Sequence, residues 1–246
     1  MFRKGLYLLL LFFILLAVSA CGSEDNPDGS EDNSNSTGEV EQASTEQSMD
    51  NGLPPLPDFI QEKGKLIVGV KADFPPFGFI NENGEPDGYD IDLAKTVAEY
   101  AFGDSEAIEF VTVTSANRIP FLDSEKVDVV IATLGITEER MEQIDFTDPY
   151  YNAAHMLLVP KDSDIEGLDD IEGEDVTTVK GATGSMALEK LVPSANQLKY
   201  DSNSEALRAL KQGRGVAMVQ DDILLYDIVE QNPDLKMVGE PFEPTP

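Results

Sequence analysis

Arg140 is the side chain whose type and setting point most directly to chemistry, since it ends the segment TLGITEER (residues 133–140). An arginine guanidinium presents a planar fork of donors that matches a carboxylate in a bidentate manner. The hydroxyls of Thr133 and Thr137 and the backbone N–H groups near Gly135 would complete the cradle at the first turn of a helix. The spacing therefore predicts carboxylate capture, although a surface ion pair with a neighbouring glutamate fits the spacing equally well.

Three further positions could line the same site. Phe74 follows the first predicted strand and either forms an apolar wall or packs in the core. The small residues at 181–185 resemble an anion-binding turn that leads into a helix, which is a weak signal by itself. Asp221 ends a predicted buried strand and either accepts a hydrogen bond from an ammonium group or caps the next helix.

No set of residues in the sequence predicts catalysis. His155 is the only histidine, lies beside a predicted strand and is expected to be structural. The chain has no Gly-x-Ser-x-Gly elbow, phosphate-binding loop or metal-spaced histidine cluster. We therefore expect no catalytic residue, no metal and no cofactor, while acid–base catalysis by carboxylates stays open.

The N-terminus predicts export and a lipid anchor. Arg3 and Lys4 precede an apolar run at residues 6–20, which is shorter than the roughly 20 apolar residues of a membrane-spanning helix. This pattern is typical of a secretory signal peptide, here residues 1–20. Cys21 directly follows the sequence VSA, as in bacterial lipoproteins whose cysteine is lipid-modified. An ordinary signal peptide followed by a chance cysteine is the alternative.

Composition limits the remaining choices. Residues 21–54 are rich in Ser, Asn, Asp and Glu, so they are predicted to form a lipid-anchored, disordered linker. The formal net charge of −30 excludes nucleic acid as a partner, because that binding needs clustered Lys and Arg. A single cysteine excludes an intramolecular disulfide and a cysteine-based zinc site.

The rest of the chain alternates predicted strands and helices, which favours parallel βαβ units. Strands are predicted at residues 65–70, 110–113, 127–132, 175–179 and 216–219, and helices at 93–101 with Asp92 as cap, 118–122, 186–191, 205–211 and 222–229. The pattern restarts after a crossover at residues 156–160, which indicates two lobes. Ligands bind at the carboxyl ends of strands in such sheets. We therefore expect a cleft lined by the loops after Val70, Ala132, Val179 and Val219.

Four segments resemble, in order and spacing, the extracellular solute-binding proteins of polar amino acid ABC importers (family 3). They are GVKADFPPF (69–77), GYDIDLA (88–94), ITEER (136–140) and DFTDPYY (145–151), within a resemblance that runs from about residue 66 to residue 243. The resemblance implies an α/β, two-lobed periplasmic-binding-protein-like fold of type II. Each lobe would be a mostly parallel sheet flanked by helices, with the ligand in the interlobe cleft.

The resemblance also implies roles for individual residues. Arg140 would clamp the ligand α-carboxylate, Asp221 would accept from the α-ammonium group, and Phe74 would stack on the ligand. The other implied ligand-binding residues are Thr133, Gly135, Lys180, Thr183 and Gly184, of which the two threonines would donate hydrogen bonds.

Arg118 carries the expectation about the ligand's side chain. The segment TSANRIP (114–120) is similar to the glutamate- and aspartate-binding branch of the family, which implies that Arg118 meets a side-chain carboxylate. A second buried cation would stabilise that carboxylate. A ligand with a neutral side chain would leave the buried cation unpaired. A solvent-exposed arginine at a helix start is the alternative. Lys71 stands where the family often has an acidic residue and would also suit an anionic ligand, whereas Gly135 replaces a common hydroxyl residue.

The N-terminal sequence and the resemblance together divide the chain into five expected parts. These are the signal peptide (1–20), the linker (21–54), lobe 1 (55–157), lobe 2 (158–240) and the start of a return crossover (241–246). Chains of the family continue beyond this point and complete the first lobe. We therefore expect that part of the first lobe to be absent and an apolar surface to be exposed there.

These features predict a substrate-binding lipoprotein of an amino acid ABC importer, anchored to the outer face of a bacterial cell membrane. It would be a monomer that closes around a polar, acidic amino acid (glutamate or aspartate) and delivers it to the permease subunits. Glutamine and other neutral polar amino acids stay open as ligands. We expect a binding protein rather than an enzyme. The alternatives are a cyclohexadienyl-dehydratase-like enzyme on the same fold and an extracellular ligand-sensing module.

Overall fold

The computed structural model describes residues 55–246, which belong to one compact unit. The predicted signal peptide (1–20), the lipidation site Cys21 and the linker (21–54) lie outside the described residues. Of the helices formed by residues 55–246, none combines the length and the apolar character needed to cross a membrane.

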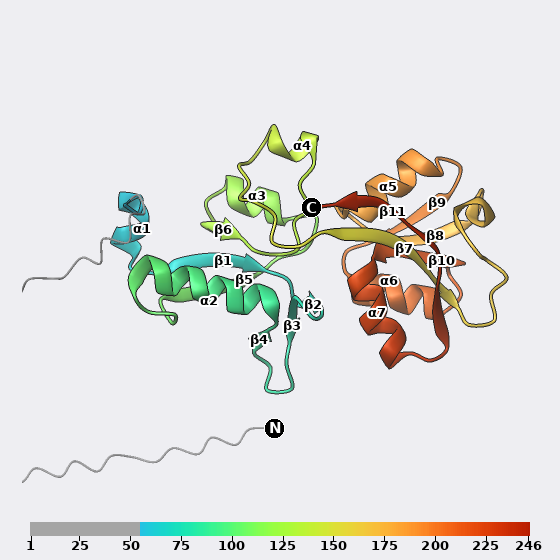
Figure 1. Cartoon of the computed structure of the whole chain (residues 1–246), viewed down its shortest axis with the longest axis horizontal. Helices are drawn as coiled ribbons and strands as arrows, with labels where there is room; N and C mark the ends of the chain where they lie inside the picture. Colours follow the sequence, from blue (N-terminus) through green and yellow to red (C-terminus); the bar gives the residue numbers. More distant parts are fainter. Residues whose placement is uncertain (1–54) are drawn as a thin grey trace, which may run out of the picture. The chain divides into compact units, whose positions relative to one another are not determined.

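The first lobe contains a parallel sheet of three strands in the order β5-β1-β6 (Figure 1). The central strand β1 (Leu66–Val70) pairs along its whole length with β5 (Ile108–Thr112) and more briefly with β6 (Val129–Val130). Its sequence LIVGV is almost entirely buried, as expected for an apolar run in a strand that is covered on both faces. This confirms the first predicted strand, whereas β6 is shorter than the predicted strand at residues 127–132.

Helices and a small antiparallel sheet complete the first lobe (Figure 1). The helices are α1 (Asp58–Lys63), α2 (Tyr89–Phe102), α3 (Arg118–Asp123) and α4 (Glu138–Met141). The small sheet consists of β2 (Asp73–Phe74), β3 (Gly78–Ile80) and β4 (Pro86–Asp87).

Helix α2 begins earlier than the predicted cap at Asp92, so that prediction is wrong. Gly88 occupies the N-cap position with φ 115°, a left-handed conformation that a glycine adopts without steric cost. The helix therefore starts at Tyr89, and Asp90 in its first turn is fully buried. The end is as predicted, because Gly103 follows the helix in the left-handed conformation.

The second lobe is built on a five-stranded sheet in the order β11-β7-β10-β8-β9. Its strands are β7 (Ala153–Pro160), β8 (Asp175–Val179), β9 (Asn196–Tyr200), β10 (Ala217–Asp221) and β11 (Leu235–Thr245), and its helices are η1 (Leu168–Ile171), α5 (Thr183–Leu191), α6 (Asn203–Lys211) and α7 (Asp222–Gln231). Strand β8 is parallel to β9 and β10, whereas β7 is antiparallel to β10 and β11. The predicted strands here and the helices α6 and α7 are confirmed, and α5 begins earlier than predicted.

Strand β11 was not predicted, and its sequence explains why. LKMVGEPFEPT contains a glycine and two prolines, which normally argue against a strand. They are tolerated because β11 lies at the edge of the sheet and its pairing with β7 shifts register at Phe242 and again before Thr245. The strand leads back towards the first lobe, where the Ile136 backbone N–H donates to the Pro246 carbonyl at 2.9 Å.

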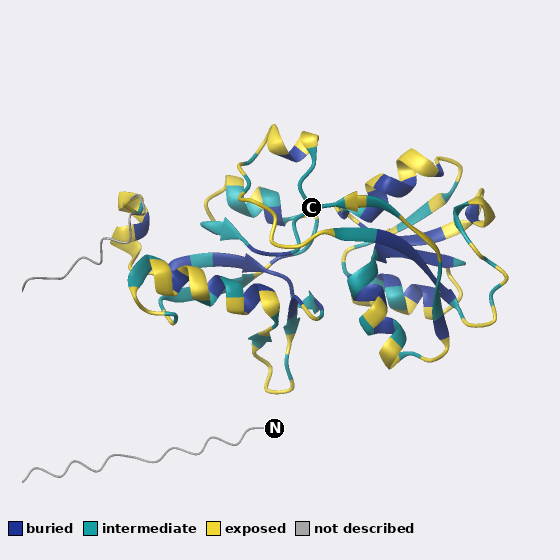
Figure 2. Ribbon diagram, viewed as in Figure 1, coloured by how far each residue is buried: buried dark blue, intermediate teal, exposed yellow. Residues whose placement is uncertain are grey.

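The buried residues follow β1 in the first lobe and β7, β8 and β10 in the second (Figure 2). One cluster joins the lobes, because Phe74 and Phe77 of the first pack with Met156 and Leu224 of the second. Complete burial of side chains of this size stabilises the fold by roughly 1.5–3 kcal/mol each. Apolar packing therefore continues beneath the place where the two lobes meet.

Candidate functional site

A cavity of about 380 Å³ is lined by residues of both lobes. Phe74, Thr133 and Gly135 line it from the first lobe, and Thr183 and Asp221 line it from the second. The volume falls within the range of small-molecule sites. Five of the predicted ligand-binding residues thus share one cavity. It also extends along β6, the edge strand of the first sheet.

Arg140 is not among the residues that line this cavity, but it contacts Gly135, which is. Arg140 is 6% exposed, and its backbone N–H donates to the Thr137 hydroxyl that caps α4. Its Nη1 donates to the Gly135 carbonyl at 2.6 Å, and its Nη2 donates to the Gly181 carbonyl of the second lobe at 2.9 Å. Burial lowers the pKa of Arg140, while Glu139 and Asp221 oppose the shift.

No carboxylate of the described residues forms an ion pair with Arg140. The alternative prediction, a surface ion pair with a neighbouring glutamate, is therefore wrong. A desolvated cation bound only to carbonyl groups gains stability from an anion placed against it.

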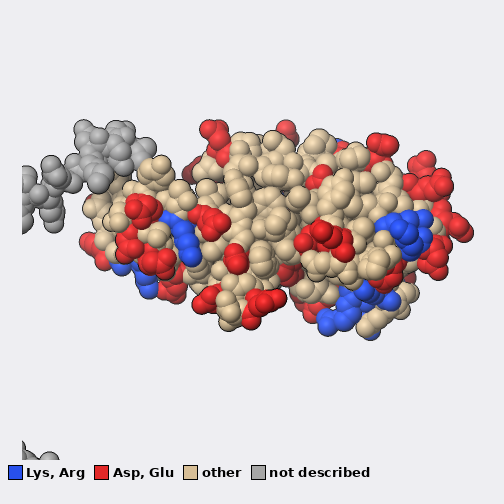
Figure 3. All heavy atoms as spheres, turned by 60° about the horizontal axis from the view of Figure 1, so that its bottom comes forward, with Lys and Arg blue, Asp and Glu red and all other residues tan. Residues whose placement is uncertain are grey.

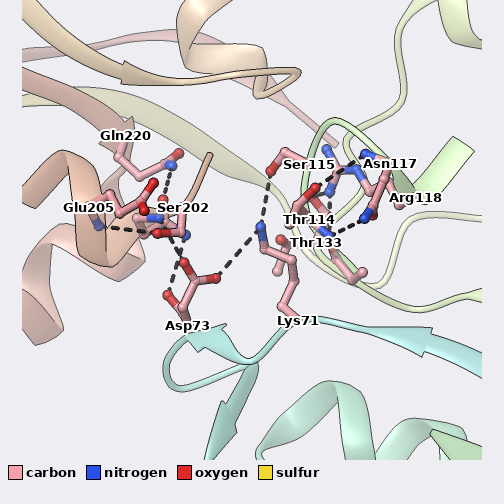
Figure 4. Close-up of polar contacts among 12 residues, drawn as sticks. Lys71, Asp73, Thr114, Ser115, Asn117, Arg118, Thr133, Ser202, Glu205 and Gln220 are labelled. Atoms are coloured by element: carbon pink, nitrogen blue, oxygen red, sulfur yellow. Dashed lines mark hydrogen bonds and ion pairs between the residues drawn. The ribbon is translucent and has the colours of Figure 1, made fainter. Parts of the chain in front are cut away.

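Arg118 is buried behind the loop that carries Thr133. It is 2% exposed, so the alternative of a solvent-exposed arginine is wrong. Its Nη1 donates to the Ala132 carbonyl at 2.6 Å and to the Thr133 carbonyl at 3.1 Å (Figure 4). Burial, followed by the nearby charge of Arg140, lowers the pKa of Arg118 to about 9. Arg118 is not among the residues that line the cavity, and its contact with a ligand carboxylate stays a prediction.

The loop around Thr133 is held in a conformation that its own sequence does not favour. Thr133 has φ 48°, and a left-handed conformation costs a non-glycine residue roughly 1–2 kcal/mol. The Arg118 guanidinium donates to the Thr133 carbonyl. Asp90 lies on the other side and accepts a hydrogen bond from the Tyr150 hydroxyl at 2.9 Å. Burial raises the pKa of Asp90 to about 6, while the hydrogen bonds from Tyr150 and the Thr133 backbone act to lower it.

Lys71 is a third buried cation, at the end of β1. It is 2% exposed, its Nζ donates to the Ser115 hydroxyl at 3.0 Å, and it lies 3.8 Å from Asp73 Oδ1 (Figure 4). Burial lowers the pKa of Lys71 to about 8, and Asp73 opposes the shift. The loop after Val70 therefore reaches the region between the lobes, as predicted.

Asp73 also forms a direct link between the lobes. Its Oδ2 accepts from the Asn203 backbone N–H at 2.7 Å, and the Asn203 Nδ2 donates to the Asp73 carbonyl at 3.3 Å. Asn203 is the first residue of α6, where a carboxylate is favourable. Its Oδ1 accepts from Gln220 Nε2 at 2.5 Å. Sequence reasoning missed this link, because Asn203 belongs to none of the motifs and only the fold brings it to Asp73.

The turn at residues 181–185 lies against the first lobe. Gly181 has φ 72°, and a Cβ there would lie 2.7 Å from the Ser115 carbonyl oxygen of the first lobe. Glycine is therefore required both by conformation and by space. Gly184 is buried against Val219, and the Lys180 ammonium group pairs with Asp201 at 2.7 Å. Neither Gly184 nor Lys180 lines the cavity.

Gly135 has a steric explanation. A Cβ at this position would overlap the side chain of Thr245 and approach Thr183 Cγ2 to 3.3 Å. The hydroxyl residue that is common at this position in the family would therefore not fit here without movement of Thr245.

Asp221 ends β10, and its side chain does not cap α7. The alternative prediction of a capping role is therefore wrong. Its side chain is 13% exposed, and Oδ1 lies 3.0 Å from His155 Nδ1. His155 was expected to be structural, and its place beside Asp221 was not predicted.

The charges of this region contrast with those of the exterior. Acidic side chains are spread over the face shown in Figure 3, where lysines and arginines gather in a few places. The buried charged residues of the described chain include Lys71, Arg118 and Arg140, all near the junction of the lobes. A strongly acidic protein thus buries three cations near the junction of its lobes, although the charged residues that line the cavity itself are aspartates.

Two α/β lobes with a cavity lined by residues of both are the architecture of a solute-binding protein. The chain belongs to the bacterial extracellular solute-binding proteins, family 3, whose model matches residues 66–235. The predicted α/β, two-lobed fold of type II periplasmic binding proteins is confirmed.

Individual relatives cover most of the chain. It is 38% identical over 240 residues to the glutamine-binding protein of Geobacillus stearothermophilus (97% of this chain, 87% of the relative). It is 35% identical over 240 residues to the ABC transporter glutamine-binding protein GlnH of Bacillus subtilis (97% and 81%). The solved structure of a cysteine-binding protein from Campylobacter jejuni is similar with a TM-score of 0.72 and 40% identity, and the match covers 76% of this chain and 78% of that chain.

Proposed function

We propose that this protein captures an α-amino acid between its two lobes and delivers it to the permease of an ABC importer. The observation that carries the proposal is the setting of Arg140, a buried guanidinium with one carbonyl partner from each lobe and no ion pair within residues 55–246. The ligand α-carboxylate supplies the missing anion. Because Gly181 belongs to the second lobe, this binding also links the two lobes.

The second lobe holds the α-ammonium group of the ligand. Asp221 lines the cavity, and its carboxylate accepts from the α-ammonium group. Phe74, which is 3% exposed and lines the same cavity, forms the apolar wall. The hydroxyls of Thr133 and Thr183 donate to the ligand. Ligand contacts with both lobes favour the closed arrangement over an open one.

The ligand side chain is acidic in this proposal, as in glutamate or aspartate. Once Arg140 has taken the α-carboxylate, Lys71 and Arg118 remain as desolvated cations in the same region. A second carboxylate offsets their desolvation, whereas a carboxamide supplies only a dipole. The two relatives named for glutamine make that amino acid the competing ligand.

The place of action follows from the family and the N-terminal sequence. Members are extracellular solute-binding proteins, and we propose that lipid on Cys21 holds this one at the outer face of the membrane as a monomer. Mass spectrometry of the membrane-bound protein should find diacylglycerol on Cys21. Substitution Cys21→Ser should release the protein into the medium, and its retention in the membrane would contradict the anchor.

A thermal-shift screen of the full chain against the twenty amino acids tests the proposed ligand class. A ligand that binds only the native state raises the melting temperature. We expect the largest increase with glutamate or aspartate. An increase with glutamine alone keeps the receptor and overturns the acidic specificity. No increase with any amino acid, for a chain that melts cooperatively, overturns the receptor.

A further inference from the structure

His155 occupies a position that the proposed site does not yet use. It is the only histidine of the chain and its side chain is fully buried on β7. The strand register places it directly opposite Asp221 on β10 and opposite Phe242 on β11. It therefore lies in the floor of the second lobe, immediately behind the carboxylate that lines the cavity.

The two ring nitrogens of His155 face complementary groups. Nδ1 lies 3.0 Å from Asp221 Oδ1, and Nε2 lies 3.5 Å from Thr245 Oγ1. An ionised carboxylate only accepts hydrogen bonds, so a pairing of His155 with Asp221 requires a proton on Nδ1, while the Thr245 hydroxyl beside Nε2 donates to the Glu243 carbonyl at 3.3 Å. Gly184 at the start of α5 is a further neighbour of the imidazole, since a Cβ there would lie 3.7 Å from Nδ1, an ordinary van der Waals contact.

Nothing else in the described chain holds the Oδ1 side of the Asp221 carboxylate. Asp221 stands at the N-cap of α7 but makes no capping hydrogen bond with its side chain, and its buried Oδ1 makes no hydrogen bond with any of residues 55–246, although His155 Nδ1 lies 3.0 Å from it. The adjacent Asp222 differs, because its Oδ1 accepts from the Ile223 backbone N–H at 2.8 Å. The orientation of Asp221 therefore depends on a single imidazole.

We propose that His155 is a positioning residue that fixes the Asp221 carboxylate to receive the ligand α-ammonium group. This inference rests on the proposed function and deepens it. His155 would not touch the ligand. It would set the preference of the site for α-amino acids over acids of the same length that lack the amino group. If His155 were only a packing residue beside Phe242, its loss would weaken binding of both kinds of ligand alike.

Two substitutions separate these roles. His155→Asn places an amide Nδ2 where Nδ1 was, and so keeps a donor to Asp221. His155→Leu fills a similar volume without a donor. Calorimetric titration of the full chain with L-glutamate and L-glutamine, each beside its des-amino analogue (glutarate and glutaramate), measures the preference for the amino group.

We expect His155→Leu to reduce the preference for the bound amino acid over its analogue by roughly 10- to 100-fold. His155→Asn should restore most of it. In an Asp221→Asn background, His155→Leu should have no further effect on the preference, because both changes act through one interaction. An equal loss for amino acid and analogue, or an unchanged preference in His155→Leu, would overturn the proposal.

A measurement without ligand keeps the inference separate from the proposed function. The imidazole ¹⁵N signals of a ¹⁵N-histidine-labelled full chain belong to one residue, since the sequence has one histidine. We expect a proton on Nδ1 and a marked change of the signals in Asp221→Asn. A neutral ring protonated on Nε2 overturns the pairing of His155 with Asp221. Protonated Nδ1 together with no binding of any amino acid would retain the pairing and reject the proposed function.

Discussion

The two sides of the cavity hold their charges in different ways. On the first-lobe side, the Arg118 and Arg140 guanidinium groups are each held by two backbone carbonyls, and Lys71 is held by Ser115. On the second-lobe side, the Asp221 carboxylate faces one imidazole. The two guanidinium groups are thus held by the main chain, whereas Lys71 and the Asp221 carboxylate have side chains as neighbours. We infer that the first-lobe side supplies most of the affinity and that the second-lobe side supplies the selectivity for ligands with an α-amino group.

The largest effect is expected from Arg140→Ala, which removes the first-lobe anchor of the α-carboxylate. Binding of L-glutamate should weaken by roughly 2–5 kcal/mol, because the ligand carboxylate would be buried without its partner. Isothermal titration calorimetry measures the change. Arg214→Ala removes an exposed arginine of the second lobe and serves as the control. An unchanged dissociation constant for Arg140→Ala would remove Arg140 from the site.

A smaller effect is expected from Arg118→Met, which tests whether this cation serves the fold or the ligand. The carbonyls of Ala132 and Thr133 would lose their donor, at a cost of roughly 1–3 kcal/mol for a buried group. We expect the free energy of unfolding in urea, without ligand, to fall by about 2 kcal/mol.

Arg208→Met, at an exposed position on α6, is the matched control for Arg118→Met. Two readouts then separate the roles of Arg118. If Arg118→Met lowers the free energy of unfolding but keeps the preference for L-glutamate over L-glutamine, Arg118 serves the loop alone. Unchanged stability with the glutamate preference lost assigns it to the ligand carboxylate and contradicts a structural role.

The link between the two sides can be tested at Asn203, the first residue of α6. Proline is tolerated at this helix position but has no backbone N–H, so Asn203→Pro removes the donor to Asp73 that Asn203→Ala keeps. We expect Asn203→Pro to bind L-glutamate about 1 kcal/mol more weakly than Asn203→Ala. The factor should be the same for every ligand, since the bond stabilises closure. A factor that differs between glutamate and glutamine would show that Asp73 acts on the ligand side chain.

The smallest expected effect is the uptake of a proton when L-glutamate binds. The pKa of Lys71 is lowered by burial to about 8, and a ligand carboxylate beside it raises that pKa again. Binding of L-glutamate should therefore take up a proton near pH 8, and its affinity should fall as the pH rises through 8. At pH 6.5 Lys71 is charged before and after binding, so the effect should vanish there.

Calorimetry in two buffers of different ionisation enthalpy measures this uptake. Lys71→Gln should abolish it, and L-glutamine should show less of it than L-glutamate. Equal proton uptake by the wild type and Lys71→Gln would assign the effect to another group.

Local sequence patterns predicted the elements that carry the site, but not every contact within it. The apolar and β-branched residues of β1, β8 and β10 and the TLGITEER segment could be recognised in the sequence, because each signal lies within a few adjacent residues. The start of α2 was missed because a glycine with positive φ, rather than the side chain of Asp92, begins the helix.

Contacts between distant segments could not be predicted from the sequence. The link of Asp73 to Asn203 and that of His155 to Asp221 join residues far apart in the chain. Neither pair forms a motif, and the fold alone decides that they meet. Arg118 shows the same limit, since its residue type indicated a buried cation but not the two carbonyl groups that it holds.

Calorimetric titration of the full chain with L-glutamate and with 4-aminobutyrate, which lacks the α-carboxylate, tests the central claim most directly. Both ligands carry an ammonium group and a carboxylate, but only L-glutamate can satisfy Arg140 and Asp221 from one α-carbon. We expect L-glutamate to bind and 4-aminobutyrate to bind at least tenfold more weakly, since one buried charge pair is lost. Equal binding of the two, or no binding of L-glutamate, would contradict the account.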